Sequence, residues 1–214
     1  MKLLLGTRLG RSFFRRPTLK VARDLVGCLL IHDSPSGLAA GMIVETEGYT
    51  GSDDPGSHAA RGLGRRNAPM FGPPGRAYVY KCHMYPLLNV VTEPEGRPGA
   101  VLIRALEPVA GFDLMARRSP RLPGHAVASG PGRLTRALGI RMGHNRADLI
   151  HGPLRLARPR DRRPRRGSGL RRSAALRRSA ALRVIITTRI GLKGPAALMR
   201  RRFVAAGNPC VSRV

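Results

Sequence analysis

The sequence predicts a mixed α/β fold of the α+β kind: a single domain with a curved, mainly antiparallel sheet surrounded by helices. Apolar, strand-like runs are joined by short turns in the first and middle parts of the chain, as in hairpins, and only a few helical stretches lie between them. The chain has 214 residues, of which 42% are apolar. That is enough for one sizeable core, and we expect one domain over residues 1–214.

The first predicted element is a short helix that leads into a strand. Val21, Ala22 and Leu25 are spaced so that they share one helical face, and Thr18 stands where a helix cap is expected. The apolar run at Cys28–Ile31 follows directly and predicts a buried strand.

A turn and a second strand come next. Ser34–Gly37 has the composition of a turn, so Leu38–Tyr49 is expected to pair back on the preceding strand as a hairpin. Gly51–Arg76 is rich in Gly and Pro and shows no periodicity. A connection of this length is usually either functional or disordered.

The rest of the chain alternates strands and short helices, apart from one basic segment. This segment, at about residues 155–183, contains the repeat LRRSAALRRSAALR, whose period of six fits neither helix nor strand. Because its arginines repel one another, we assign it no structure and treat it as a low-complexity insertion in the domain. The other predicted elements are strands at Ala77–Val91, Ala100–Leu106, Val184–Leu192 and Arg202–Val211, a turn at Glu93–Pro98, and helices at Pro108–Ala116 and Gly130–Leu138.

Charge and composition limit the class of function. Lys and Arg number 39 against 12 Asp and Glu, which gives a formal net charge of +27. Such a chain attracts polyanions, with nucleic acid the first partner to consider and an acidic membrane surface the second. No apolar run approaches the ~20 residues of a membrane-spanning helix. The three cysteines show no CxxC or zinc-ligand spacing. We expect a cytoplasmic protein with no membrane association.

Two groups of residues are candidates for chemistry. Glu45, Glu47 and Tyr49 alternate on a strand and so share one face, where a carboxylate beside an aromatic ring is suited to act as a general base. An exposed strand end explains the same pattern equally well. A third interpretation adds the loop residues Asp53, Asp54 and His58 as ligands of a metal ion.

The second group surrounds the tyrosines. Tyr78 and Tyr80 would give their strand an aromatic face, which either belongs to the core or stacks on unpaired bases. Arg104 lies in the apolar run AVLIRALEP and needs an anionic or water partner if it is buried. The simplest such partner is Glu107 or another surface acid.

Several motifs in one order resemble a known family. They are IVETEGYTG, DDPGSHAARG, RNAPMFGPPGRAYVY, NVV, AVLIRALEP, SGPGRLTRALGI and RIG. Together they resemble the alkyladenine DNA glycosylases, also called 3-methyladenine or N-methylpurine DNA glycosylases. The similarity covers about residues 13–154 and continues from residue 184 to the end.

The resemblance implies an enzyme that repairs DNA. Such an enzyme flips alkylated or deaminated purines out of duplex DNA and hydrolyses the N-glycosidic bond with a carboxylate-activated water, leaving an abasic site. It needs no cofactor and no metal, and we expect a monomer acting on double-stranded DNA in the cytoplasm, associated with the nucleoid. Only Lys81 offers a lysine within the motifs, which gives little support to a Schiff-base lyase step.

The resemblance also implies residue roles. Glu47, rather than Glu45, matches the catalytic base, and Arg104 matches the arginine that helps to hold the nucleophilic water. By the same resemblance the base-pocket residues are Tyr49, His58 and Tyr80, which stack on the base, Asn89, which disfavours guanine, and Ile190, whose backbone carbonyl contacts the water.

One motif departs from the family. After YVY the family has a tyrosine and then a glycine, where a hairpin enters the gap left by the flipped base. This chain reads KCHMYPLLN and is about one residue shorter. We therefore expect His83 to act as the DNA wedge, with Met84 beside it. The alternative is that the shorter hairpin places Met84 or Tyr85 in the gap.

Two other classes of function are compatible with the composition. A non-enzymatic basic protein that binds RNA or the ribosome would account for the charge but would leave the Glu47, Tyr49 and His58 pattern without a role. A metal-dependent phosphoesterase would use the five acid and histidine side chains of the metal interpretation, which are Glu45, Glu47, Asp53, Asp54 and His58.

Overall fold

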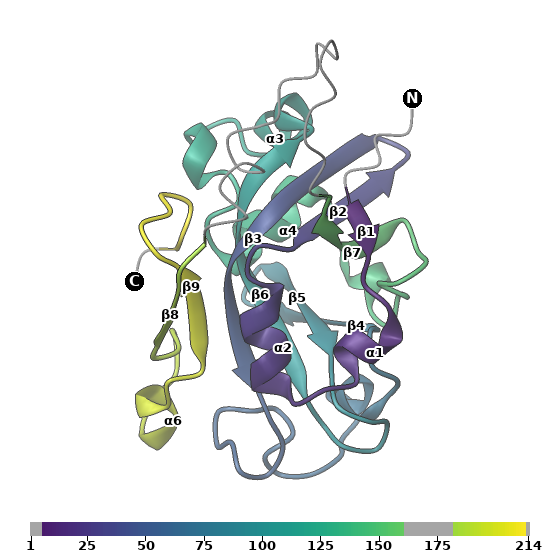
Figure 1. Cartoon of the computed structure of the whole chain (residues 1–214), viewed down its shortest axis with the longest axis vertical. Coiled ribbons are helices and arrows are strands. Elements are labelled where there is room, and N and C mark those ends of the chain that lie inside the picture. Colours follow the sequence, from purple (N-terminus) through teal and green to yellow (C-terminus); the bar gives the residue numbers. More distant parts are fainter. Residues whose placement is uncertain (1–5, 161–181, 213–214) are drawn as a thin grey trace.

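The fold is organised around one antiparallel sheet whose longest strand, β3, lies at its centre (Figure 1). The computed structural model describes residues 6–160 and 182–212. Within them the strands follow the order β1-β7-β2-β3-β6-β5-β4, with β9 also paired to β3 and β8 paired to β9. The strands are β1 Gly6–Arg8, β2 Leu29–Ser34, β3 Gly37–Tyr49, β4 Ala77–Cys82, β5 Tyr85–Val91, β6 Ala100–Ala110, β7 Leu154–Pro159, β8 Val184–Thr187 and β9 Arg202–Ala205.

Short helices surround this sheet, and together they confirm the predicted mixed α/β class. None of the helices described is long and apolar enough to cross a membrane. The helices are α1 Arg11–Phe14, α2 Thr18–Leu25, α3 Phe112–Arg118, α4 Pro131–Leu138 and α6 Pro195–Leu198, with 3-10 turns η1 Ala68–Phe71, η2 Gly124–Ala126 and η3 Met142–His144.

β3 lies in the middle of the strand order, and both of its faces are buried. Ile43 packs into the larger core cluster, whereas its neighbours Met42 and Val44 pack into a second cluster on the opposite face. The pairing of β3 with β6 shifts register at three points, the last two on either side of Glu45. Such bulges bend a strand and redirect its side chains. The bend lies at Glu45, the first acidic residue after the apolar run of β3.

The hairpin of β2 and β3 and the helix α4 confirm the predictions for those segments. The predicted cap of α2 is wrong in detail, because Thr18 is the first helical residue rather than the cap. The N–H of Thr18 donates to Glu93 Oε1 at 2.6 Å. The cap thus comes from a distant loop, in which Glu93 adopts the left-handed conformation with a φ of 64°.

Several predicted elements have the wrong boundaries. The strands predicted at Val184–Leu192 and Arg202–Val211 are shorter, because β8 ends at Thr187 and β9 ends at Ala205. Ala77–Val91 is not one strand but the hairpin of β4 and β5, in which Cys82 pairs with Tyr85 around a two-residue turn. The helix predicted at Pro108–Ala116 starts too early, because β6 continues to Ala110. Gly111, with a φ of 77°, then ends the strand and starts α3.

The predicted basic insertion also begins too early. Residues 154–159 form β7, which pairs with β1 and β2, and Leu154, Leu156 and Ala157 are buried in it. Leu154 and Leu156 lie on either side of Arg155 in the sequence and pack into the larger core cluster, whereas Ala157 packs into the second cluster. Residues 161–181, which include most of the predicted insertion, lie outside the described residues.

Candidate active site

Glu47 lies near the end of β3, and its side chain is fully buried. The hydroxyl of Tyr49 donates to Glu47 Oε2 at 2.7 Å, and the backbone N–H of Ile190 donates to Oε1 at 2.8 Å. Arg104 Nη1 lies 3.4 Å from Oε1. The alternative of an exposed strand end is therefore wrong. The carboxylate is held at a point where β3, β6 and the segment after β8 meet.

Glu45 is also fully buried, but its hydrogen-bonding capacity is used within the protein. Its Oε1 accepts hydrogen bonds from Arg104 Nε and Arg202 Nε, both at 2.7 Å, and from Ser212 Oγ at 2.8 Å. Its Oε2 accepts from the N–H of Ser212 at 2.7 Å. Glu45 thus ties β6, β9 and the segment around residue 212 together.

Arg104 connects the two glutamates. The sequence placed its simplest partner among surface acids such as Glu107, whereas the structure pairs it with Glu45 and Glu47. Burial lowers the pKa of Arg104, but the charges of Glu47 and Glu45 outweigh this effect and raise it. The guanidinium therefore stays charged and balances part of the buried negative charge.

A second buried ion pair, formed by Asp54 and Arg189, lies beside the ring of Tyr49. Arg189 donates from Nη1 to Asp54 Oδ2 and from Nη2 to Asp54 Oδ1, each at 2.7 Å, and both side chains are fully buried. The guanidinium carbon of Arg189 lies 4.6 Å from the ring centroid of Tyr49. Because Ile190 follows Arg189, this pair also fixes the N–H that reaches Glu47.

The acidic residues of the metal interpretation do not converge. Asp53 pairs with Arg201 at 3.2 Å, whereas Asp54 pairs with Arg189 and Glu45 with Arg104. Across residues 6–160 and 182–212, no group of three or more His, Cys, Asp or Glu side chains is placed to hold a metal ion. The carboxylates of these acids therefore pair with arginines.

A narrow aromatic cavity of about 80 Å³ lies next to the buried carboxylate. The ring centroids of His58 and Tyr80 are 4.6 Å apart, nearly edge to face, and His58 Nδ1 lies 2.8 Å from the hydroxyl of Tyr78. The cavity is lined by Tyr49, Gly56, His58, Met70, Tyr78, Tyr80, Asn89, Ala100 and Leu192. The structure thus brings together Tyr49, His58, Tyr80 and Asn89 from the predicted set.

Asn89 and Ile190 are positioned by backbone contacts. The buried side chain of Asn89 donates from Nδ2 to the carbonyl of Tyr78 at 3.1 Å, which fixes the amide at the cavity wall. For Ile190, the resemblance pointed to its carbonyl oxygen. The contact described here involves its N–H, which donates to Glu47.

The titratable groups of the cavity are neutral near pH 7. Burial lowers the pKa of His58, and the positive charge of Arg66 lowers it further. Burial raises the pKa of Tyr49, and the negative charge of Glu47 adds to this effect. Burial likewise raises the pKa of Tyr80. The guanidinium carbon of Arg66, an exposed residue, lies 5.3 Å from the ring centroid of Tyr80, so a cation stands beside the aromatic group.

The tip of the β4–β5 hairpin is exposed. Met84 is 78% exposed, and His83 is exposed in the left-handed conformation with a φ of 49°. A glycine would adopt this conformation without strain. His83 therefore has the backbone conformation that a glycine in this turn would favour. Neither residue lines the cavity, and both lie in the turn between β4 and β5.

Sequence reasoning missed the roles of Tyr78, Arg189 and Arg202. In the sequence, Tyr78 belongs only to a possible aromatic face, and Arg189 is only one residue of the RIG motif.

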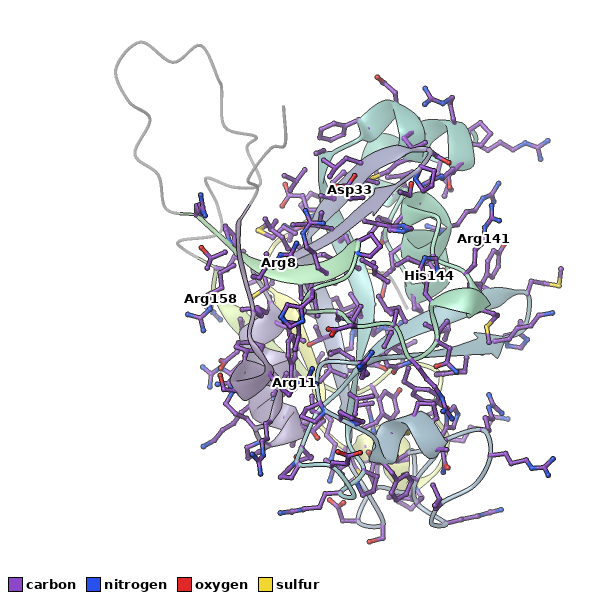
Figure 2. All side chains as sticks on the ribbon, turned by 90° about the vertical axis from the view of Figure 1, so that its right-hand side faces the viewer. Arg8, Arg11, Asp33, Arg141, His144 and Arg158 are labelled. Carbon is purple, nitrogen blue, oxygen red and sulfur yellow. The ribbon has the colours of Figure 1, made fainter. Side chains whose placement is uncertain are left out.

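Arginines outside these buried pairs lie on several parts of the surface. Figure 2 shows Arg8, Arg11 and Arg158 on the side of α1, β1 and β7, and Arg141 near η3 on another side.

Comparisons with known proteins agree on one family. A family model described as methylpurine-DNA glycosylase (MPG) matches residues 12–209. A protein of Methanoculleus marisnigri named "Putative 3-methyladenine DNA glycosylase" is 42% identical over 94% of this chain and 97% of its own length. Proteins with the same name from Methanocella arvoryzae and Chlorobaculum tepidum are 41% and 37% identical, each over 96% of this chain and over 96% and 91% of their own lengths.

The Asp54–Arg189 pair yields a prediction about stability. Asp54→Asn leaves a buried guanidinium without its counter-charge, so we expect the free energy of unfolding to fall by about 3–5 kcal/mol. The neighbouring Asp53→Asn is the matched control. Its side chain is 64% exposed, so the loss should stay below about 1 kcal/mol. Urea denaturation of both variants measures the difference, and equal losses would contradict the structural role of Asp54.

Proposed function

This chain belongs to the methylpurine-DNA glycosylase family, and we propose that it is a monofunctional DNA repair glycosylase acting on alkylated and deaminated purines. It would flip the damaged purine out of the duplex and hydrolyse the N-glycosidic bond, leaving an abasic site. The observation that carries the mechanism is the buried carboxylate of Glu47 beside an aromatic cavity. No cofactor is invoked in this mechanism.

In the proposed reaction Glu47 is the general base. It accepts a proton from a water molecule as the oxygen of that water attacks the sugar C1′, and the bond from C1′ to the purine nitrogen breaks. The purine leaves with the electron pair of that bond. When alkylation has made the purine cationic, it leaves as a neutral molecule and needs no strong acid from the protein. Arg104 and Ile190 are proposed to hold the water, because both already contact Glu47.

The aromatic cavity is proposed to receive the flipped base. Flipping costs a few kcal/mol, least for a damaged or mispaired base, and stacking on an aromatic ring returns about 1–3 kcal/mol. Tyr49 and Tyr80 offer π faces that also favour a cationic purine. The neutral imidazole of His58 adds a third ring without adding charge. Asn89, fixed at the wall, is proposed to disfavour guanine.

The hairpin tip is proposed to fill the gap that the flipped base leaves in the duplex. Its exposure supports this role for His83, with Met84 beside it. The basic surface supports duplex DNA as the substrate. Each arginine that contacts a phosphate releases counterions from the DNA, and this release favours binding. Action as a monomer in the cytoplasm, near the nucleoid, belongs to the same proposal.

The first test is excision by Glu47→Gln. An amide cannot accept the proton from water, so this variant should bind a duplex containing hypoxanthine or ethenoadenine but form no abasic sites, a loss of at least ~100-fold in single-turnover rate. Abasic sites are counted as alkali-induced strand breaks. The exposed Asp53→Asn is the control and should keep the wild-type rate, with and without a chelator.

Two results would contradict the proposed mechanism. Wild-type protein that binds nucleic acid and forms no abasic sites would favour the non-enzymatic alternative, and activity lost on adding a chelator would favour the metal-dependent one.

The lowered pKa of His58 predicts a lesion-specific pH dependence. The imidazole stays neutral below its usual value of about 6.5, and it gains a proton only as the pH falls through its lowered pKa. That positive charge repels a cationic purine. The ratio of the 7-methylguanine rate to the hypoxanthine rate should therefore stay constant down through about pH 6.5 and fall only at lower pH, as the pH passes through the lowered pKa of His58. His58→Gln should flatten this ratio, and an equally steep ratio in that variant would assign the effect to another group.

The wedge role of His83 is tested by base-analogue fluorescence, which reports flipping directly. His83→Ala should lower the flipping equilibrium and the excision rate, and His83→Tyr should preserve or raise both. His83→Asn is the matched control, because asparagine tolerates the left-handed backbone but carries no ring. It should behave like the alanine variant. An unchanged signal in His83→Ala together with a lost signal in Met84→Ala or Tyr85→Ala would move the wedge to that neighbouring residue.

A further inference from the structure

Basic side chains gather on β1, α1, α2 and β7, apart from the aromatic cavity. Residues 8–24 contain six Lys and Arg but only one acid, Asp24. β7 adds two arginines and no acid. We call the surface of these four elements the α2 basic surface and define it by six side chains, which are Arg8, Arg11, Arg16, Lys20, Arg23 and Arg158.

The four elements form one continuous surface. β1 and β7 are antiparallel neighbours in the sheet. The guanidinium carbons of Arg16 and Arg158 lie 4.3 Å and 5.7 Å from the ring centroid of Phe13, which connects β7 to α1. On α2, Lys20 and Arg23 are exposed and lie three positions apart, so they share one side of the helix.

The sheet separates this surface from the buried carboxylate. The hydroxyl of Thr46 on β3 donates to the carbonyl of Ala22 at 2.7 Å, so α2 packs on the face of β3 to which Thr46 points. Neighbouring residues of a strand point to opposite faces, and Glu47 accordingly reaches the hydroxyl of Tyr49 in the wall of the aromatic cavity. The outer side of α2 therefore faces away from the proposed active site.

The hairpin tip also lies away from the α2 basic surface. Met84 and Arg141 line one hollow, so Arg141 marks the side of the molecule to which the hairpin tip belongs. Figure 2 shows Arg141 on the right of the molecule and Arg8, Arg11 and Arg158 on its left. A duplex that receives the hairpin tip would therefore leave the α2 basic surface open.

Most of the charge on this surface is not balanced within the described residues. Asp24 lies 2.9 Å from Arg16, and Asp148 lies 4.0 Å from Arg11. The other four cations have no acid within ion-pair distance in the described part of the chain, and they are Arg8, Lys20, Arg23 and Arg158. Unbalanced positive charge attracts an anionic partner.

The chemistry of the surface favours the backbone of a nucleic acid duplex as that partner. Among the described residues, the exposed large apolar side chains all lie outside β1, α1, α2 and β7, so the surface has none to enter a lipid bilayer. Phe13 is half-buried and already contacts two guanidinium groups, so it is poorly placed to stack on unpaired bases. Phosphates in a duplex require only cations.

We propose that the α2 basic surface binds the backbone of a second DNA duplex while the hairpin side holds the first. This inference rests on the proposed function, because the first duplex is the one under repair. Binding of the second duplex would be independent of sequence, since only its phosphates are contacted. A molecule that holds two duplex segments at once can pass directly from one to the other during its search for damage.

The first experiment measures how a second duplex binds to protein that already holds one. Glu47→Gln protein, which should leave the damaged base in place, is saturated with a donor-labelled hypoxanthine duplex and titrated with an acceptor-labelled undamaged duplex. Energy transfer between the dyes reports the complex of both. Adding Lys20→Gln, Arg23→Gln and Arg158→Gln together should weaken binding of the second duplex at least ~10-fold at low salt and reduce the slope of log K against log salt by about three.

The matched control removes three exposed cations from other parts of the molecule, by Arg97→Gln, Arg117→Gln and Arg121→Gln together. The first duplex is kept saturating in both variants. The control should bind the second duplex about as well as the parent protein. Equal losses in the two triple variants would reduce the α2 basic surface to general surface charge and overturn the proposal, as would a parent protein that gives no energy transfer.

A double variant covers the case in which Arg158 is needed for folding. Lys20→Gln and Arg23→Gln change only exposed positions of α2, so this variant should fold and still reduce the salt slope by about two. An unchanged slope in the double variant would overturn the proposal.

Competition identifies the class of polyanion. Unlabelled duplex DNA, single-stranded RNA and phosphatidylserine vesicles are each added to the complex of both duplexes at equal phosphate concentration. Duplex DNA should displace the labelled second duplex most effectively. Stronger displacement by the RNA or by the vesicles would overturn the choice of duplex DNA.

Energy transfer between two undamaged duplexes is independent of excision. Wild-type protein that brings two such duplexes together but forms no abasic sites would refute the proposed function and support the second duplex site. Excision that proceeds without energy transfer at any duplex concentration would refute the site and leave the function standing.

Discussion

Negative charge buried at the end of β3 is the constraint on which the rest of the site depends. Glu45, Glu47 and Asp54 are all fully buried, and a carboxylate removed from water without a partner costs several kcal/mol. The partners are Arg104, Arg202 and Arg189. They come from β6, β9 and the segment after β8, so neutralising the three acids also fixes these elements against β3. The general-base candidate is held still as a result.

Local patterns were sufficient for the elements whose partners are close in sequence. The β2–β3 hairpin and α4 follow from apolar periodicity and turn residues alone. The residue pattern alone predicted one strand at Ala77–Val91, and only the family resemblance indicated a hairpin there. His83 and Met84 carry none of the usual turn signals, and the left-handed backbone of His83 accompanies the pairing of Cys82 with Tyr85. In β7, the arginine-rich composition concealed a short strand in which only Leu154 and Leu156 share one buried face.

The candidate site was only partly visible for a related reason. Glu47 and Tyr49 were found because they alternate on one strand, and the family resemblance placed His58, Tyr80 and Asn89 beside them. The pair of Asp54 and Arg189 spans 135 positions, and the bonds from Ser212 to Glu45 span 167. No periodicity connects residues so far apart. The sequence also could not tell a buried carboxylate acting in chemistry from one acting in structure, because only the partners distinguish Glu47 from Glu45.

The pairing of each buried acid with a buried arginine has a colloidal consequence. These three acids and three arginines balance one another, so the whole formal excess of +27 belongs to the rest of the chain. Copies of the protein in dilute salt therefore repel one another and remain dispersed at concentrations where a neutral protein of this size would associate. A polyanion removes that repulsion, and the same molecules can then lie close together along it. The spacing between neighbouring molecules would be set by the number of phosphates that each one neutralises.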